Sequence, residues 1–135
     1  GTDGAASNND LDMFGEMKTA ALLAKGISAD ASACNAQQVI QMATINGARA
    51  LGLADEIGSI EIGKRADLIA VNLSDINTVP LYNVIAQLAY ATNSRQVSHV
   101  WIDGLCQLSQ YQFTRLDQDS IRHKAKAWSS KIRNH

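Results

Sequence analysis

The sequence has no excess of charge of either sign, few aromatic residues, one proline and no long apolar run. Its net charge is −1, from 12 basic and 13 acidic residues, which favours neither a nucleic acid nor an anionic membrane as partner. No run approaches the roughly 20 apolar residues that span a bilayer. The hydrophobic fraction of 46% and the charged fraction of 19% are typical of a soluble globular protein. At 135 residues, the chain has the size of one ordinary domain.

Residues that support redox, metal or nucleophilic chemistry are also scarce. The two cysteines, Cys34 and Cys106, stand far apart without CxxC spacing, which favours two reduced thiols and a cytoplasmic location. The three histidines form neither an HxH nor an HExxH pair, so packing or surface roles are favoured over metal ligation for His99, His123 and His135. No GxSxG elbow and no glycine-rich phosphate loop is present.

A first helix is predicted after a polar opening loop. Asn9 or Asp10 can cap it, with Asp12 placed favourably in its first turn. Lys25 followed by Gly26 is a typical stop signal. The apolar positions at helical spacing, expected to fill a core rather than to contact a cofactor, are Met13, Met17, Ala20, Ala21 and Ala24.

Two more helices are predicted over about 36–51 and about 81–92. Gly52 followed by Leu53 fits a left-handed glycine at the end of the first of them. The residues expected on the buried side of that helix are Val39, Ile40, Ala43, Gly47, Ala50 and Leu51.

The pattern changes near Asp55 from helical spacing to short strands. Alternating isoleucines between glycines predict a short strand with tight bends over 57–64. The continuous apolar run 68–71 predicts a strand that is covered on both faces.

A hairpin and a last helix follow. Asp103-Gly104 is a strong two-residue turn signal between strands predicted over 97–102 and 105–108, and a further short strand is expected to include Tyr111 and Phe113. Asp117 can then cap a helix whose basic face is most simply a solvated surface. The apolar side of this helix consists of Ile121, Ala125, Trp128 and Ile132.

The opening stretch carries the strongest functional signal. Asp3 lies between Thr2 and Gly4, an arrangement that suits the C-terminal end of a β-strand opening onto a site. An Asp before Gly is often only a turn residue, but a dense polar loop follows this one. That loop contains Ser7, Asn8, Asn9 and Asp10. We therefore expect Asp3 to be one member of a site whose other members lie outside this chain, and the chain to be the closing segment of a larger enzyme.

Four stretches carry a resemblance to a known family. They are residues 1–13 (GTDGAASNNDLDM), 42–52 (MATINGARALG), 57–71 (IGSIEIGKRADLIAV) and 97–104 (VSHVWIDG). Together they resemble the amidohydrolase superfamily, in the branch of methylthioadenosine/S-adenosylhomocysteine deaminases and triazine hydrolases. The stretch 57–71 is typical of the superfamily as a whole, whereas the opening motif favours the deaminase branch.

The resemblance implies an α/β fold with β additions, namely the C-terminal end of a metal-dependent TIM-barrel hydrolase plus part of its composite β-sandwich. Residues 1–53 would form the end of the last barrel strand and the following helices, 54–114 the sandwich strands, and 115–135 a C-terminal helix packed outside. Without the remaining barrel portion, apolar surfaces would stay bare and favour association. We accordingly expect a homo-oligomer.

The resemblance also implies one divalent metal, commonly zinc, in the complete enzyme. Asp3 would bind this metal and help to deprotonate a water molecule, which attacks a ring carbon bearing an amino group, or a halide in the triazine relatives. The substrate would be a small aminated heterocycle of purine type, and ammonia would leave. The family's metal histidines and ring-protonating acid have no match here, so we expect the chain alone to be inactive and to hold no metal tightly.

Two other interpretations remain open. The first is a non-enzymatic α+β module that binds a partner through the surfaces that a barrel would otherwise cover; a cooperative, monomeric chain would favour it. The second is an autonomous enzyme that uses Asp3 with Glu16 or Asp10, although no motif spacing supports it.

The expected lack of further ligands predicts weak zinc binding by the 135-residue chain, because one carboxylate does not hold the ion against water. Calorimetric titration with a zinc salt should give no submicromolar dissociation constant. A submicromolar value would contradict the view that the other ligands lie outside this chain.

Overall fold

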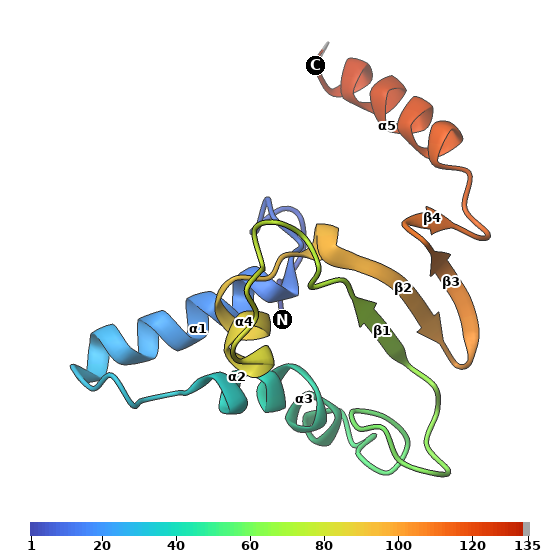
Figure 1. Ribbon diagram of the computed structural model, residues 1–135. Coiled ribbons are helices and arrows are strands. Elements are labelled where there is room, and N and C mark those ends of the chain that lie inside the picture. Colours follow the sequence, from blue (N-terminus) through green and yellow to red (C-terminus); the bar gives the residue numbers. More distant parts are fainter. Residues whose placement is uncertain (134–135) are drawn as a thin grey trace.

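The computed structural model describes residues 1–133 and combines a group of four helices, a four-stranded antiparallel sheet and a last helix that extends away from both (Figure 1). The helices are α1 (Met13–Ser28), α2 (Ala36–Ala43), α3 (Ile45–Ala50), α4 (Val84–Tyr90) and α5 (Gln118–Arg133), with a 3-10 turn η1 (Ser94–Gln96). The strands are β1 (Leu68–Val71), β2 (Val97–Ile102), β3 (Leu105–Ser109) and β4 (Gln112–Phe113). This mixture of helices and short strands confirms the predicted α/β class with β additions. Within the described range, no helix is both long and apolar enough to cross a membrane.

The sheet follows the sequence signals closely. Its order is β1-β2-β3-β4 with every neighbouring pair antiparallel, and β2 has the predicted bounds. Asp103 and Gly104 both have positive φ, 50° and 75°, as the predicted two-residue hairpin turn requires. Tyr111 was expected in the last strand, but it lies with Gln110 in a second tight turn and β4 begins after it.

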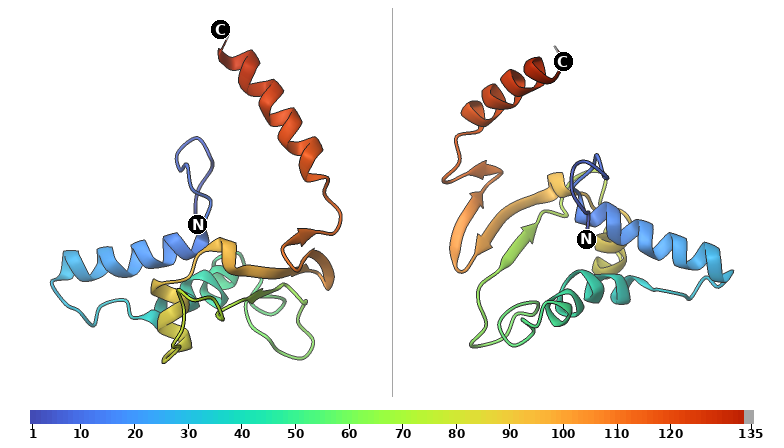
Figure 2. Two further views of the ribbon diagram at one scale, coloured as in Figure 1. Left: turned by 45° about the horizontal axis from the view of Figure 1, so that its top comes forward. Right: turned by 180° about the vertical axis from the view of Figure 1, so that it is seen from behind.

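The start of α1 lies later than predicted. Asp12, and neither Asn9 nor Asp10, is the N-cap, and its side chain accepts a hydrogen bond from the amide of Phe14. Residues 1–12 therefore form a longer loop than the sequence suggested (Figure 2).

The end of α1 was also predicted wrongly. The helix continues through Gly26 to Ser28 and ends at Ala29, whose φ of 52° is left-handed. Lys25 does not mark the end of the helix, because its ammonium group reaches forward to the carbonyl oxygens of Ala33 and Cys34, at 2.5 and 2.9 Å. Lys25 thus fastens the following loop to α1.

The single helix predicted over 36–51 is broken at Thr44. Its φ and ψ of −123° and −102° are not helical, and its hydroxyl donates to the carbonyl oxygen of Ile40, a contact known to bend helices. Only Val39 of the predicted buried side is fully buried; Ile40 and Gly47 are half-buried, whereas Ala43, Ala50 and Leu51 are exposed. The predicted glycine ending is confirmed, since Gly52 has a φ of 72°. The helix predicted over 81–92 is shorter, because Asn83 caps it and it ends at Tyr90.

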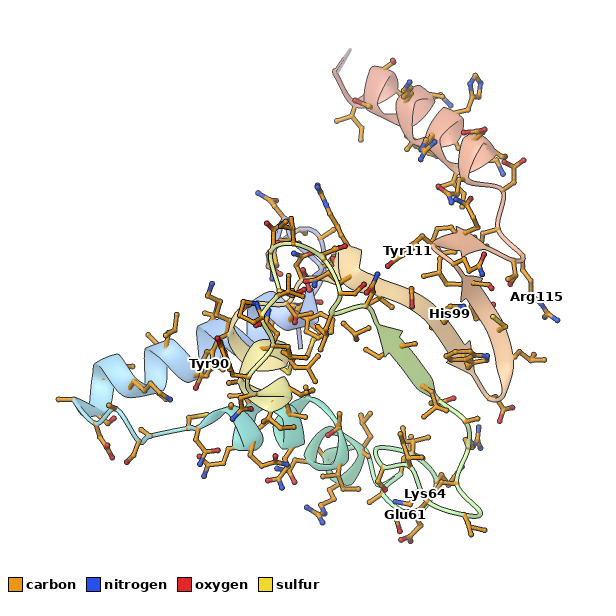
Figure 3. All side chains as sticks on the ribbon, in the orientation of Figure 1. Glu61, Lys64, Tyr90, His99, Tyr111 and Arg115 are labelled. Carbon is orange, nitrogen blue, oxygen red and sulfur yellow. The ribbon has the colours of Figure 1, made fainter. Side chains whose placement is uncertain are left out.

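Residues 57–64 do not form the predicted strand. The ammonium group of Lys64 donates to the carbonyl oxygen of Ala54 and to the hydroxyl of Ser59, both at 2.6 Å, and pairs with Glu61 at 3.3 Å. Figure 3 shows Lys64 and Glu61 side by side in this loop, which closes on itself instead of pairing with the sheet. The isoleucines that suggested a strand, Ile60 and Ile62, point into solvent.

The core is small. Ala21 of α1, Val39 of α2 and Ala89 of α4 form its buried centre, with Met17 and Ala20 packed against it as predicted, whereas Met13 is partly exposed. The accessible surface is 9946 Å², while a compact protein of this mass exposes about 6,900 Å². Many large apolar side chains are exposed, in agreement with the expectation of bare surfaces.

Part of that apolar surface forms a groove of about 550 Å³ between the start of α1 and the sheet. Ile69 of β1 is 55% exposed there, so β1 is not covered on both faces as predicted. The other apolar residues that line the groove are Leu11, Met13, Phe14, Val97, Val100, Ile102, Leu108, Phe113 and Leu116.

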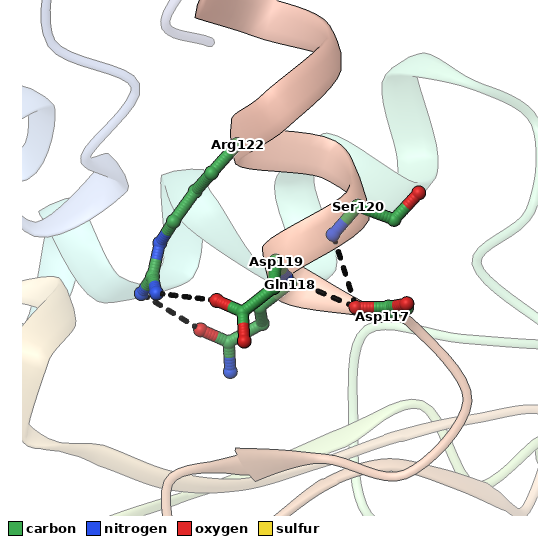
Figure 4. Close-up of polar contacts among 5 residues, drawn as sticks. All are labelled: Asp117, Gln118, Asp119, Ser120 and Arg122. Atoms are coloured by element: carbon green, nitrogen blue, oxygen red, sulfur yellow. Dashed lines mark hydrogen bonds and ion pairs between the residues drawn. The ribbon is translucent and has the colours of Figure 1, made fainter.

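The last helix begins as predicted. One oxygen of Asp117 accepts hydrogen bonds from the amides of Asp119 and Ser120, each at 3.0 Å (Figure 4). Arg122 pairs with Asp119 at 3.1 Å on the same first turn. The apolar side chains of α5 are exposed, at 50% for Ile121 and 64% for Trp128. Figure 1 shows α5 extending away from the other helices and from the sheet.

Gly58, in the loop 57–64, packs closely against α3, so we expect Gly58→Ala to lower the stability of the fold strongly. An added Cβ would lie 2.8 Å from the Cβ of Ala48 and 2.9 Å from the Cα of Ile45, on a backbone with a φ of 90°. Gly63→Ala is a matched control, because Gly63 has a φ of 93° and open space around it. Urea unfolding should show Gly58→Ala to lose about 2 kcal/mol more than Gly63→Ala. Equal losses would mean that only the backbone conformation matters.

Candidate functional site

Asp3 lies in a hydrogen-bonded loop ahead of α1. Its φ of 60° is in the left-handed region, which few residues other than Gly, Asn and Asp adopt. One carboxylate oxygen accepts a hydrogen bond from the amide of Gly4 at 2.7 Å, and the other accepts one from the hydroxyl of Ser7 at 2.8 Å. Both oxygens are therefore held in place by groups within four residues.

The rest of the loop is ordered by the polar residues singled out in the sequence. The amides of Ser7 and Asn8 both donate to the carbonyl oxygen of Gly4, at 3.0 Å. The side chain of Asn8 donates to Glu16 on α1 at 2.8 Å and accepts from the amide of Asp10 at 3.0 Å. The turn that holds Asp3 is thus connected to the first turn of α1.

The pKa of the Asp3 carboxyl lies below its ordinary value, because the amide of Gly4 and, next in size, the hydroxyl of Ser7 donate hydrogen bonds to the charged form. Asp3 is therefore ionised at neutral pH. It is also exposed, so its remaining lone pairs are accessible to a cation or to a water molecule. An ionised, accessible carboxylate can serve as a metal ligand or as a proton acceptor.

A complete metal site would require more ligands than residues 1–133 bring together. In this range no group of three or more His, Cys, Asp or Glu side chains is arranged to hold an ion. Neither Glu16 nor Asp10, the proposed partners of Asp3, is hydrogen-bonded to it: Glu16 is bonded to Asn8, as described above. The chemistry of Asp3 fits that of one ligand among several.

The two histidines that the structure describes lie on elements other than the opening loop. His99 is on β2 (Figure 3), where it stacks on Trp101 with ring centroids 5.4 Å apart and its Nδ1 lies 3.0 Å from the hydroxyl of Ser98. His123 is on α5 and exposed. His135 lies outside the described residues. Cys34 and Cys106, predicted to be free thiols, are unpaired in this structure.

Sequence reasoning missed a contact that connects the opening loop to the sheet. The second oxygen of the Asp12 carboxylate accepts a hydrogen bond from the amide of Ser94 at 2.9 Å. Asp12 was recognised as part of a helix start, but Ser94 lies 82 residues further along the chain. No local pattern could have paired them.

Comparison with known proteins gives one family match, to the amidohydrolase family over residues 1–106. The chain is similar to the 5-methylthioadenosine/S-adenosylhomocysteine deaminase of Saccharophagus degradans, with 48% identity over 132 residues that cover 98% of this chain and 30% of the relative. The enzyme of the same name from Moorella thermoacetica is 48% identical over 121 residues, covering 90% of this chain and 28% of the relative. The chain thus spans about 30% of the length of the curated relatives it matches.

Two crystal structures resemble the whole arrangement. An adenosine deaminase from Xanthomonas campestris with bound zinc has 50% identity and a TM-score of 0.97, covering 100% of this chain and 31% of that one. An atrazine chlorohydrolase from Arthrobacter aurescens complexed with zinc has 25% identity and a TM-score of 0.81, covering 92% and 28%. The opening loop, the helices and the sheet therefore recur together in longer chains.

The hydrogen bond from Ser7 predicts that Ser7→Ala raises the pKa of Asp3 part of the way toward its ordinary value. The return is only partial, because the amide of Gly4, the larger cause, remains. An NMR titration of the Asp3 carboxyl carbon measures this change. Ser7→Thr keeps the hydroxyl and should leave the pKa low; an unchanged pKa in Ser7→Ala would show that the hydroxyl does not stabilise the charged form.

Proposed function

Because the chain belongs to the amidohydrolase family, we propose that it is the C-terminal part of a metal-dependent hydrolase that cleaves C–N bonds outside peptides. The observation that carries this proposal is the ionised carboxylate of Asp3, held by Gly4 and Ser7 within the part of the chain that matches the family. The high identity to deaminases supports the reaction type.

We further propose that the reaction is hydrolytic deamination of a purine-type ring. The relatives with 48% identity are named deaminases of methylthioadenosine and S-adenosylhomocysteine, and a structure with 50% identity is named an adenosine deaminase. The triazine-related structure has only 25% identity, so it supports a halide leaving group less. In the proposed reaction, a water oxygen bonds to the ring carbon, the C–N bond breaks and ammonia leaves.

Asp3 supplies the contribution of this chain to that chemistry. A divalent metal, most simply zinc as in the similar structures, lowers the pKa of a water molecule toward neutrality when it is bound. The Asp3 carboxylate would be one ligand for this ion; it would also accept the proton of the attacking water and return it to the departing nitrogen. Ser7 and the amide of Gly4 orient the two carboxylate oxygens and lower the pKa of the carboxyl.

The exposed apolar surface supports the proposed place of this chain in a larger fold. We propose that residues 1–53 are the end of the last TIM-barrel strand with its helices, 54–114 the strands of a composite sandwich, and 115–135 the final helix. The groove beside Ile69 and the bare side of α5 would then be covered by other parts of the enzyme. A homo-oligomer in the cytoplasm remains part of the proposal.

The proposal is tested with the native product that contains this sequence. Its intact mass and the sequence upstream of Gly1 should reveal an HxH-bearing barrel. The zinc-loaded protein should release ammonia from 5′-methylthioadenosine or S-adenosylhomocysteine. Asp3→Asn, which cannot accept a proton, should lower kcat by at least about 100-fold.

Asp10→Asn is the matched control, because it removes the same charge from the same loop. It should retain activity within a small factor. Equal activity of Asp3→Asn and the unmodified protein would overturn the assignment of Asp3, whereas an upstream sequence without an HxH pair would overturn the reaction class.

A further inference from the structure

One carboxylate joins two segments that are distant in sequence. Asp12 caps α1 through one oxygen, which accepts from the amide of Phe14 at 2.9 Å, and binds the amide of Ser94 through the other, also at 2.9 Å. Ser94 is the first residue of η1, and β2 follows η1 directly at Val97. The Asp12 carboxylate therefore connects the beginning of α1 to the beginning of a central strand of the sheet.

The Ser94 end of this contact is itself fixed. Asn93 caps η1, its side chain accepting from the amide of Arg95 and its own amide donating to Gln96. The side chain of Gln96 is buried and donates to the carbonyl oxygen of Asn72, just beyond β1. The amide of Ser94 is thus presented by a turn that leads directly into β2 and is hydrogen-bonded to the residue that follows β1.

The Asp12 end leads to the loop of Asp3. Asn8 bonds to Glu16 one turn along α1, and the turn that starts at Gly4 holds Ser7 and Asn8. A continuous set of hydrogen bonds consequently runs from the Asp3 carboxylate through this turn to α1, and from α1 through Asp12 to the sheet. Figure 1 shows the loop before α1 beside the start of β2.

We propose that Asp12 is a positioning residue for Asp3: by binding Ser94 it fixes the loop of Asp3 relative to the sheet. The inference rests on the role proposed above for Asp3 and adds to it. Asp12 touches no reacting atom, and it acts by holding the start of α1, from which the loop projects. Without this contact, the start of α1 and the loop before it would lack their hydrogen bond to the turn that precedes β2.

Ser94→Pro tests the contact while leaving Asp12 in place. Proline removes the N–H of residue 94 and fits the first position of a helical turn, and the extended backbone of Asn93 suits a residue that precedes proline. Ser94→Ala is the matched control for the N–H, which it keeps; it removes the hydroxyl, whose smaller contribution also lowers the pKa of Asp12. Asp12→Ser is a second variant, because serine can still cap α1 but has a single oxygen.

The readout is the NMR spectrum of the metal-free 135-residue chain. In Ser94→Pro and Asp12→Ser, the amide proton of Gly4 should move toward its random-coil position, and the Asp3 carboxyl carbon should shift with it. In Asp12→Ser, the amide of Ser94 should exchange about tenfold faster, as expected for one lost hydrogen bond to a charged group. The amide of Ala21, inside α1, should be unaffected in all variants, and Ser94→Ala should lie closer to the unmodified chain than Ser94→Pro does, because it keeps the N–H, the larger contribution.

The results separate positioning from mere stability. A lower melting temperature with unchanged Gly4 and Asp3 signals would overturn the proposal, as would faster exchange at Ser94 alone. Failure of this proposal can be told apart from failure of the proposed function. The proposed function is tested by zinc-dependent ammonia release, whereas the positioning role of Asp12 is tested by NMR without metal or substrate.

Discussion

The limited burial of apolar side chains is the constraint on which the rest of this structure depends. In the part of the chain that the structure describes, only five hydrophobic residues are buried, and three of them are alanines: Phe14, Ala21, Val39, Ala48 and Ala89. Large apolar side chains such as Ile69 and Trp128 remain more than half exposed. Since burial is the main driving force for folding, the helices and the sheet have few shared contacts to fix their relative places. This agrees with the proposal that the chain is one part of a larger enzyme.

Hydrogen bonds between polar side chains and the backbone connect segments that share little apolar packing. Lys25 fastens the loop after α1, Lys64 closes the loop ahead of β1, and Asp12 joins α1 to the turn before β2. Each of these side chains bonds to backbone groups, which cannot move without moving their segment. The candidate site belongs to this polar framework, because Asp3 is held by Gly4 and Ser7 and not by any apolar neighbour.

Local chemistry explains which parts of the fold could be predicted. The hairpin at Asp103-Gly104 and the cap at Asp117 were found because the signal and its effect lie within a few residues. The strand predicted over 57–64 failed because Lys64 closes that segment on itself, a contact that alternating isoleucines do not reveal. The single helix predicted over 36–51 failed for a similar reason. The hydroxyl of Thr44 bonds to Ile40, and the loop at Gly58 packs against the segment that follows, and a continuous helical pattern reveals neither contact.

In the candidate site, too, contacts between near neighbours in the sequence could be predicted and distant contacts could not. Asp3 and Ser7 lie four residues apart and could be recognised together, whereas the pairing of Asp12 with Ser94 required the folded chain. A complete set of metal ligands could be read from neither source, because residues 1–133 bring together no group of three or more His, Cys, Asp or Glu side chains that could hold an ion. The family resemblance, found from the opening motif and confirmed by the match over residues 1–106, was the stronger source of information.

The left-handed backbone at Asp3 restricts this position in a second way, independent of its charge. Glutamate carries the same carboxylate, but its longer side chain does not bond locally to its own turn, and it populates a φ near 60° less readily than Asp or Asn. Asparagine suits the backbone but lacks the charge, and glycine suits the backbone but lacks a side chain. Aspartate meets both demands, so the geometry of the main chain and the chemistry of the side chain favour the same amino acid.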